Sequence, residues 1–368
     1  MISSKDIINN FKKKKINFFT GVPDSVLKDL TGLFDANRNI KHIVAVNEGS
    51  AISIATGYHL SSKKIPCVYL QNSGLSNAIN PIISITHKKV YSIPMVLIIG
   101  WRGSPNKKDE PQHNVKGKIT KKLLTLLNIK HCILRKKNDI NKLNNLITYS
   151  SKNNTPVACL IEKDTIFPKI KVKKSNKLKN FYRKDFIFSL LKNIKKNTKI
   201  ISTTGYTSRE LKQIRDEKNI STGEDFYMVG GMGHSLMVAF GFSINSKKNV
   251  ICLDGDGSLL MHLGSLRTLG KLGNKNIKHI LLNNNSHESV GGQPTLADGI
   301  NFKSLIKSLG YKKYYKISNK KNLSKNIKKF LNSKGPSFLE VTISNGTINN
   351  LSRPRNLIKI KKNFMKKK

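Results

Sequence analysis

The stretch NVICLDGDGSLLMH (residues 249–262) places an apolar run directly before two acidic residues that stand among glycines. A second apolar run, KHILLNNN (278–285), ends in three asparagines. Uninterrupted Val, Ile and Leu runs of this length are typical of strands in a parallel sheet that helices cover on both faces. Such sheets bind ligands at the carboxyl ends of their strands, so these acids and asparagines are expected to face a ligand.

Similar apolar runs, separated by helical patterns, recur along the whole chain. They lie at residues 42–46, 66–70, 94–100, 131–134 and 156–162, and again at 199–205, 225–231, 249–257, 278–285 and 336–344. The Lys-rich stretch between the two groups, residues 169–184, has no apolar periodicity and is predicted to be a linker. A chain of 368 residues exceeds the usual size of one hydrophobic core. The sequence therefore predicts two doubly wound parallel α/β domains, residues 1–168 and 185–368.

The chain is strongly basic, with 67 Lys and Arg against 21 Asp and Glu and a formal net charge of +46. Such a charge is typical of proteins that bind nucleic acid or an anionic surface. The Lys residues are scattered and no aromatic platform or recognition motif accompanies them, so no nucleic-acid partner is predicted. The run IPMVLIIGW (93–101) is too short to cross a bilayer, and the N-terminus lacks the apolar stretch of a signal peptide. A cytoplasmic protein without membrane association is predicted.

Seven of the 21 acidic residues lie where loops meet strands, in Gly-, Pro-, Asn- or His-rich surroundings. They are Asp24, Glu48, Asp109, Glu110, Asp254, Asp256 and Glu288. A composition that drifts toward Lys should retain acids mainly where they are needed, and loops at strand ends are common places for function. The alternative for each of them is a helix cap.

Asp256 is the strongest of these candidates for a metal ligand. It ends an apolar strand within Gly-Asp-Gly, and Asn284 ends the next strand 28 residues later. Mg²⁺ prefers oxygen ligands, and a carboxylate, a carboxamide and a main-chain carbonyl would supply half of an octahedron. Diphosphate oxygens and water could complete it. Asp254 is expected to remain a structural residue of the strand end.

Gly-Asp-Gly followed by Asn-Asn resembles the diphosphate-binding motif of thiamine diphosphate enzymes. This resemblance implies Mg²⁺ bound by Asp256, Asn284 and the main-chain carbonyl of Ser286. Upstream, DFYMVGGMGHSLMVAFG (225–241) resembles a loop of the same family that contacts the cofactor, in which Met232 would support the bent cofactor or would simply be a core methionine. The cofactor-binding residues implied in this half are Gly230, Gly231, Met232, Gly233, Gly255, Asp256, Gly257, Ser258 and Asn284.

The first half contains the partner motif, VAVNEGSAISIATGYHL (44–60), in which Glu48 resembles the cofactor-activating glutamate of the family. A carboxyl group beside the aminopyrimidine ring shares a proton with it and promotes the tautomer that activates the thiazolium carbon. The alternative is a favourable charge at a helix N-terminus. Because Glu48 and the diphosphate motif lie in different domains, the resemblance implies active sites between the subunits of a homodimer or homotetramer.

A finer resemblance is to the phosphonopyruvate decarboxylase family, which lacks the middle domain of longer decarboxylases. It is carried by TGVPDSVLKDL (20–30), YLQNSGLSNAINP (69–81), GWRGSPNKKDEPQH (100–113), TTGYTSREL (203–211) and NNNSHESVGGQPT (283–295). The implied reaction is decarboxylation of 3-phosphonopyruvate to phosphonoacetaldehyde and carbon dioxide, in phosphonate biosynthesis. Sulfopyruvate decarboxylase resembles the two halves as separate subunits, so a fused chain is expected to favour the phosphonate substrate. Other 2-oxo acid decarboxylases and carboligases of the superfamily remain alternatives, as does a basic scaffold without activity.

Position and resemblance together nominate the remaining site residues. The proposed catalytic residues are Glu48, Asp24, His113, His287 and Glu288. Arg102 is nominated to bind the phosphonate through its forked guanidinium, since Arg pairs bidentately with oxyanions. Further substrate-binding candidates are Asn72, Ser73, Gly74 and Gln112. Each of these has a plain alternative as a hydrogen-bonded loop residue or a turn former.

Overall fold

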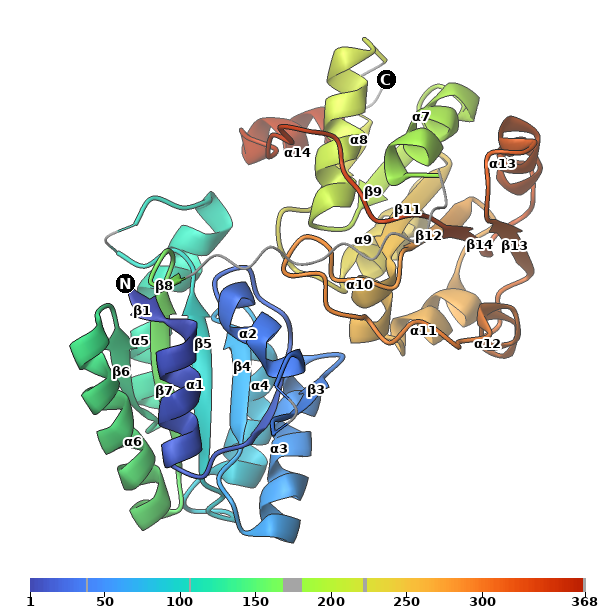
Figure 1. Cartoon of the computed structure of the whole chain (residues 1–368). Coiled ribbons are helices and arrows are strands. Elements are labelled where there is room, and N and C mark those ends of the chain that lie inside the picture. The colour runs from blue at the N-terminus through green and yellow to red at the C-terminus, as the bar shows by residue number, and fades with distance from the viewer. Residues whose placement is uncertain (38, 106, 168–180, 221–223, 367–368) are drawn as a thin grey trace. The chain divides into compact units, whose positions relative to one another are not determined.

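Each half of the chain folds around its own six-stranded parallel sheet (Figure 1). The computed structural model describes residues 1–37, 39–105, 107–167, 181–220 and 224–366. It divides into a first unit, Met1–Lys173 with His287–Gln293, and a second unit, Lys174–Ser286 with Pro294–Lys368. Most of the predicted linker lies outside the described residues, and a helix already begins at Arg183, inside the predicted linker.

The first sheet has the order β3-β2-β4-β5-β7-β6. Its strands are β2 (Phe18–Gly21), β3 (Lys41–Val44), β4 (Cys67–Gln71), β5 (Met95–Trp101), β6 (Lys130–Leu134) and β7 (Pro156–Glu162). Its helices are α1 (Ser4–Lys13), α2 (Lys28–Asp35), α3 (Glu48–Ser62), α4 (Leu75–Pro81) with the π-helical turn η1 (Ile82–Thr86), α5 (Pro111–Leu126), the 3₁₀ turn η2 (Lys137–Asp139) and α6 (Ile140–Asn153). Two short strands, β1 (Ile2–Ser3) and β8 (Ile166–Phe167), form a separate parallel pair.

Helices cover both faces of this sheet, which explains the uninterrupted apolar runs. Along β5, Val96 and Ile98 pack into the core on one face, with α1, α2 and α6. Leu97 and Ile99 pack into the core on the other face, with α3, α4 and α5. Because successive side chains of a strand point to opposite faces, a strand buried on both sides is apolar at every position.

The second sheet has the order β10-β9-β11-β12-β14-β13. Its strands are β9 (Lys199–Ser202), β10 (Asp225–Tyr227), β11 (Val250–Gly255), β12 (Ile277–Asn283), β13 (Lys313–Ile317) and β14 (Ser337–Thr342). Its helices are α7 (Arg183–Asn193), α8 (Tyr206–Glu217), α9 (Ser235–Ile244), α10 (Asp256–Met261), α11 (Ser265–Leu272), α12 (Phe302–Ser308), α13 (Leu323–Leu331) and α14 (Leu357–Met365). Side chains of β11 again alternate between two cores, one shared with α7, α8 and α13 and the other with α9 to α12 and α14.

The predicted fold class, two doubly wound parallel α/β domains, is confirmed. All ten predicted runs contain a strand, whereas β2 and β13 of the six-stranded sheets and the short pair β1 and β8 were missed. β2 is a central strand of only four residues. β13 is an edge strand whose Lys313 and Lys316 are exposed, so it does not have the continuous apolar pattern of its neighbours. Near the C-terminus, the basic residues 353–366 include α14.

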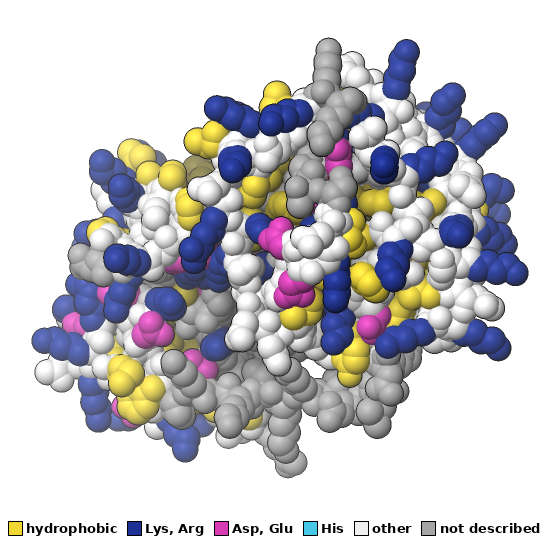
Figure 2. Space-filling view, turned by 90° about the horizontal axis from the view of Figure 1, so that it is seen from above, with side chains coloured by type: hydrophobic (Ala, Val, Ile, Leu, Met, Phe, Trp, Pro, Cys, Tyr) yellow, Lys and Arg dark blue, Asp and Glu magenta, His cyan; other side chains and the backbone are white. Residues whose placement is uncertain are grey.

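Lys and Arg side chains are spread over the face shown in Figure 2, with uncharged side chains between them. The four cysteines are free, and Cys67, Cys159 and Cys252 are buried. Among the described residues, no helix combines the length and the apolar character that a membrane crossing needs.

Candidate active site

In the first unit, predicted site residues follow the carboxyl ends of four neighbouring strands. Asp24 follows β2, Glu48 follows β3, residues 72–74 follow β4 and Arg102 follows β5. Since the strands are parallel, these residues lie along one edge of the sheet. The fold therefore brings this part of the predicted set together.

Glu48 is the first residue of α3, whose N-terminus is capped by the Asn47 side chain accepting from the Ser50 amide at 2.8 Å. The Glu48 side chain is 5% exposed, and its Oε2 accepts a hydrogen bond from Asn77 Nδ2 at 2.9 Å. Burial raises the pKa of Glu48, although the Asn77 hydrogen bond and the charge of Lys116 oppose the shift. A buried carboxyl group with a raised pKa is suited to sharing a proton with a basic ring nitrogen.

Gly74 makes room for the Glu48 carboxylate. A Cβ atom at position 74 would lie 1.8 Å from Glu48 Oε1. The backbone of Gly74 has φ −86° and ψ −7°, which any residue can adopt, so this glycine is required by space and not by conformation. The predicted substrate-binding residue Gly74 therefore positions Glu48.

Asp24 is fully buried at the end of β2. Its Oδ2 accepts hydrogen bonds from the amides of Val26 (2.9 Å) and Leu27 (3.1 Å), and Gln71 Nε2 donates to its Oδ1. The Ser73 hydroxyl donates to Gln71 Oε1 at 2.7 Å, which extends the network toward the loop after β4. Burial raises the pKa of Asp24 despite these hydrogen bonds. The network links Asp24 to Ser73 through one amide side chain.

Arg102, the predicted phosphonate binder, is 8% exposed and is paired with Asp109. Its Nε donates to Asp109 Oδ2 at 2.6 Å, its Nη2 donates to Oδ1, and its Nη1 donates to Ser25 Oγ at 3.2 Å. Burial alone would raise the pKa of Asp109, but the hydrogen bonds and charge of Arg102 lower it well below its usual range. Asn72 binds the main chain of Arg102, accepting from its amide at 3.1 Å and donating to its carbonyl at 2.9 Å. Contact of Arg102 or Asn72 with substrate stays a prediction.

Helix α5, which contains Gln112 and His113, is pressed against the end of β5. A Cβ atom on Gly117 would lie 1.6 Å from the Gly103 carbonyl oxygen, and one on Gly103 would lie 2.0 Å from the His113 carbonyl oxygen. Trp101 Nε1 donates to the Gly117 carbonyl at 3.0 Å. These contacts place the half-buried Gln112 and His113 at the site edge.

In the second unit, Asp256 begins α10 directly after β11. It is 3% exposed, and its Oδ2 accepts a hydrogen bond from Thr295 Oγ1 at 2.5 Å. Burial raises the pKa of Asp256 to about 6, although hydrogen bonds from Thr295 and the local main chain act to lower this pKa. A buried carboxylate that is incompletely compensated is suited to bind a cation. Thr295 was missed in the sequence, where only its place after Gly-Gly-Gln-Pro marks it.

Ser258 connects two predicted cofactor-binding segments with Thr203, the residue that follows β9. Its Oγ accepts from the Gly233 amide at 3.1 Å and lies 2.9 Å from Thr203 Oγ1, which donates to it. Gly231 and Gly233 have φ values of +64° and +86°, a left-handed conformation that favours glycine. Of the others, Gly230 and Met232 are half-buried in the same loop, Gly255 ends β11 and Gly257 lies in the first turn of α10.

Asn284 follows β12, which pairs directly with β11, so Asp256 and Asn284 follow adjacent strand ends. Asn285 has φ +55°, and the Ser286 amide donates to Asn284 Oδ1 at 3.2 Å. This turn offers a carboxamide and a main-chain carbonyl beside the strand that leads to Asp256, and these oxygen donors fit Mg²⁺. His287 and Glu288 lie in the next loop, which closes through a hydrogen bond from the His287 amide to the Gln293 carbonyl at 2.8 Å.

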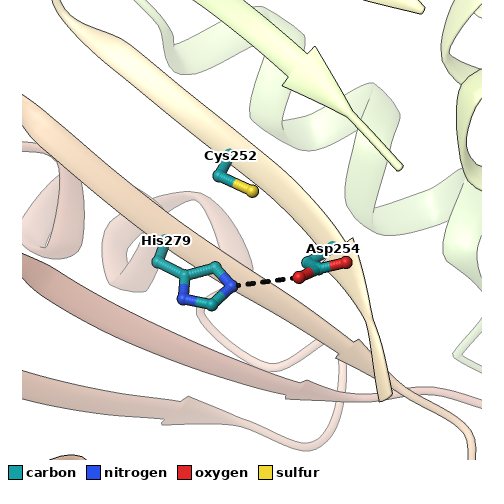
Figure 3. A group of neighbouring side chains, drawn as sticks. All are labelled: Cys252, Asp254 and His279. Atoms are coloured by element: carbon teal, nitrogen blue, oxygen red, sulfur yellow. Dashed lines mark ion pairs between the residues drawn. The ribbon is translucent and has the colours of Figure 1, made fainter. Parts of the chain in front are cut away.

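Asp254 stabilises the turn at the end of β11 through two hydrogen bonds, as expected of a structural residue. Its Oδ1 accepts from the Gly255 amide at 2.9 Å and from Ser235 Oγ at 3.3 Å. His279 on β12 points toward it from the neighbouring strand, with Nε2 3.5 Å from Asp254 Oδ2, and Cys252 lies on the same side of β11 (Figure 3). The Nδ1 of His279 lies 3.0 Å from the Tyr311 hydroxyl.

The chain matches two protein families across both units. Residues 3–123 match the N-terminal TPP binding domain of thiamine pyrophosphate enzymes, and residues 203–341 match their C-terminal TPP binding domain. The sequence is 30% identical to a phosphonopyruvate decarboxylase of Streptomyces viridochromogenes, over 96% of this chain and 92% of that protein. The chain belongs to the phosphonopyruvate decarboxylase family. It is a carboxy-lyase of the thiamine diphosphate-dependent class, without a middle domain.

Sulfopyruvate decarboxylases are also similar to this chain. The enzyme of Methanosarcina acetivorans is 26% identical over 93% of this chain and 92% of its own length. In Methanocaldococcus jannaschii, the alpha and beta subunits are 37% and 34% identical to this chain, each over 35% of it and over 74% and 66% of the subunit. Because the Methanosarcina acetivorans sulfopyruvate decarboxylase matches both units in one chain, the fusion of the two halves does not by itself favour the phosphonate substrate, contrary to the expectation from the sequence.

Proposed function

We propose that this enzyme is a thiamine diphosphate- and Mg²⁺-dependent decarboxylase of 3-phosphonopyruvate that releases phosphonoacetaldehyde and carbon dioxide. The observation that supports the chemistry is the buried Glu48 carboxyl group, hydrogen-bonded to Asn77 and seated against Gly74. The choice of substrate rests on the 30% identity to a phosphonopyruvate decarboxylase over 96% of the chain. A sulfopyruvate substrate is the second candidate, supported by the 26% identity over 93% of the chain.

The site residues are proposed to form two groups, one that binds the cofactor and one that binds the substrate. Asp256, Asn284 and the Ser286 carbonyl would hold Mg²⁺, and Ser258 with the glycines at 230, 231, 233, 255 and 257 would line the diphosphate. When bound, thiamine diphosphate supplies the nucleophilic carbon and the electron sink that decarboxylation needs. Glu48 holds a proton for a ring nitrogen of that cofactor.

Asp24 and His113 are proposed to move protons at the substrate, with His287 and Glu288 contributing from the loop after Asn284. A protonated Asp24 can donate a proton to a carbon that becomes electron-rich when carbon dioxide leaves, and its raised pKa favours the protonated form. Gln112, Asn72, Ser73 and Arg102 are proposed to surround the substrate. The subunits are proposed to form a homodimer or homotetramer with active sites between them.

The test offers phosphonopyruvate, sulfopyruvate and pyruvate in parallel to the purified protein with thiamine diphosphate and Mg²⁺, and measures the aldehyde formed. Phosphonopyruvate is expected to have the highest kcat/KM. A higher kcat/KM for sulfopyruvate would replace the substrate assignment, and no aldehyde from any of the three would overturn the proposed function. Omitting Mg²⁺ with a chelator present is expected to abolish turnover.

A further inference from the structure

Lys116 lies at the same edge of the first sheet and was not among the residues nominated from the sequence. It follows His113 by three residues and Gln112 by four on α5, so the three share one face of the helix. Its Nζ donates to the Ser73 carbonyl at 3.2 Å, in the loop that also contains Gly74. Burial raises the pKa of Glu48, and the charge of Lys116 is close enough to oppose part of that rise.

The ammonium group of Lys116 is available to bind an anion, whereas the guanidinium group of Arg102 is already paired. Arg102 is 8% exposed, and Asp109 neutralises its charge through two hydrogen bonds. Lys116 is half-buried and forms no ion pair with any carboxylate of the described residues. Glu48 interacts with Lys116 only through space, and a partly buried cation without an ion pair in contact attracts an anion more strongly than one already paired.

The position of Lys116 is fixed by its neighbours on α5. The next residue, Gly117, makes the close approach to Gly103 and accepts the hydrogen bond from Trp101. One turn further, Thr120 Oγ1 accepts from Asn72 Nδ2 at 3.0 Å. A helix held at two points against the sheet edge presents the Lys116 stem in a defined direction, which a selective anion site needs.

We propose that Lys116 binds the oxyanion that the substrate carries on C3, the phosphonate of the proposed substrate, and so selects an anionic 2-oxo acid over pyruvate. This assignment rests on the proposed function. Lysine acts as a point charge toward tetrahedral oxyanions such as phosphonate, and its three N–H groups can serve the anion and the Ser73 carbonyl together. Arg102, whose charge Asp109 already neutralises, then orders the loop after β5 beside the substrate.

The kinetic test compares Lys116→Met, Lys116→Arg and the control Lys118→Met, which removes an exposed lysine two residues along the same helix. For Lys116→Met, the ratio of kcat/KM for phosphonopyruvate to kcat/KM for pyruvate is expected to fall by about 10- to 100-fold, the range for loss of a charged hydrogen bond. Lys116→Arg is expected to restore most of the ratio, and Lys118→Met to leave it unchanged. An unchanged ratio in Lys116→Met would overturn the proposal.

A binding measurement separates this proposal from the proposed function. Trp101 is the only tryptophan of the chain and donates to the residue after Lys116, so its fluorescence should report an anion bound there. Phosphonopyruvate is titrated into the full chain without cofactor, so that no turnover occurs. We expect saturable binding whose Kd rises at least 10-fold in Lys116→Met and not in Lys118→Met. No saturable change in the wild type, or equal Kd values in both, would overturn the Lys116 assignment even if phosphonopyruvate is decarboxylated.

Discussion

The space left by Gly74 predicts how strongly activity depends on the position of Glu48. In Gly74→Ala the new Cβ atom would lie 1.8 Å from Glu48 Oε1, whereas real contacts of this kind are not shorter than 3.0 Å. The carboxylate must therefore move by about 1.2 Å, the difference between those two distances. A misplacement of about 1 Å can lower a rate about 100-fold. We expect kcat to fall by at least about that factor, equal to roughly 2.7 kcal/mol of lost transition-state stabilisation.

The assay measures carbon dioxide release at saturating substrate and cofactor, with thermal unfolding of each variant recorded alongside. Gly57→Ala is the matched control, since Gly57 lies within α3, the helix that Glu48 begins, and an added Cβ would meet nothing within 4 Å. This control should keep wild-type kcat and gain about 0.5–1 kcal/mol of stability from the better helix former. Combining Gly74→Ala with Glu48→Gln should give no further loss, because both act on one carboxylate. A folded Gly74→Ala with kcat within threefold of wild type would show that turnover does not depend on the position of the Glu48 carboxylate.

Three further predictions concern carboxylates. For Glu48→Gln we expect loss of turnover with cofactor affinity largely retained, measured by calorimetric titration; retained turnover would contradict the role of Glu48. For Asp256→Asn we expect loss of Mg²⁺-dependent cofactor binding in the same titration. Without cofactor, the Asp256→Asn variant should also be more stable than wild type at pH 7.5, by up to about 3 kcal/mol. Folding raises the pKa of Asp256 from 3.8 to about 6, so the stability of the wild type falls as pH rises through that interval. This gain should vanish below pH 4 in thermal unfolding curves, and a gain that persists there would contradict the assignment. Asp109→Ala leaves the buried Arg102 charge unpaired and should lower stability by about 3–5 kcal/mol, an effect that an additional Arg102→Met should partly reverse; an unchanged Tm would contradict it.

The sequence predicted the strands that are buried on both faces of a sheet, because such strands are apolar at every position. β11 and β12 are buried along their whole length up to the site, so apolar runs that end in Asp256 and Asn284 identified strands and site together. β13 could not be recognised in this way, because an edge strand need not be apolar throughout.

Side-chain partners were less predictable than strands. The pairing of Arg102 with Asp109 depends on the path of the loop after β5, which brings Asp109 back to Arg102. The hydrogen bond from Thr295 to Asp256 joins residues that are 39 positions apart in the sequence. Composition does not encode either contact. Lys116 was hidden among many lysines, and the signal that could have revealed it is its spacing of three and four residues from His113 and Gln112 on one helix face.

The two six-stranded sheets repeat one arrangement, since numbering the strands within each sheet in chain order gives the order 2-1-3-4-6-5 in both. Each unit also has its own pair of hydrophobic cores. The covalent connection between the two sheet-forming halves of the chain is therefore not expected to be needed for either sheet to fold. The connection would instead ensure that the two halves are made in equal numbers, and it would keep each half at a high effective concentration near the other. A chain cut within residues 168–180 and supplied as two polypeptides should then behave as a concentration-dependent enzyme, the arrangement that the separately named alpha and beta subunits of the Methanocaldococcus jannaschii sulfopyruvate decarboxylase already suggest.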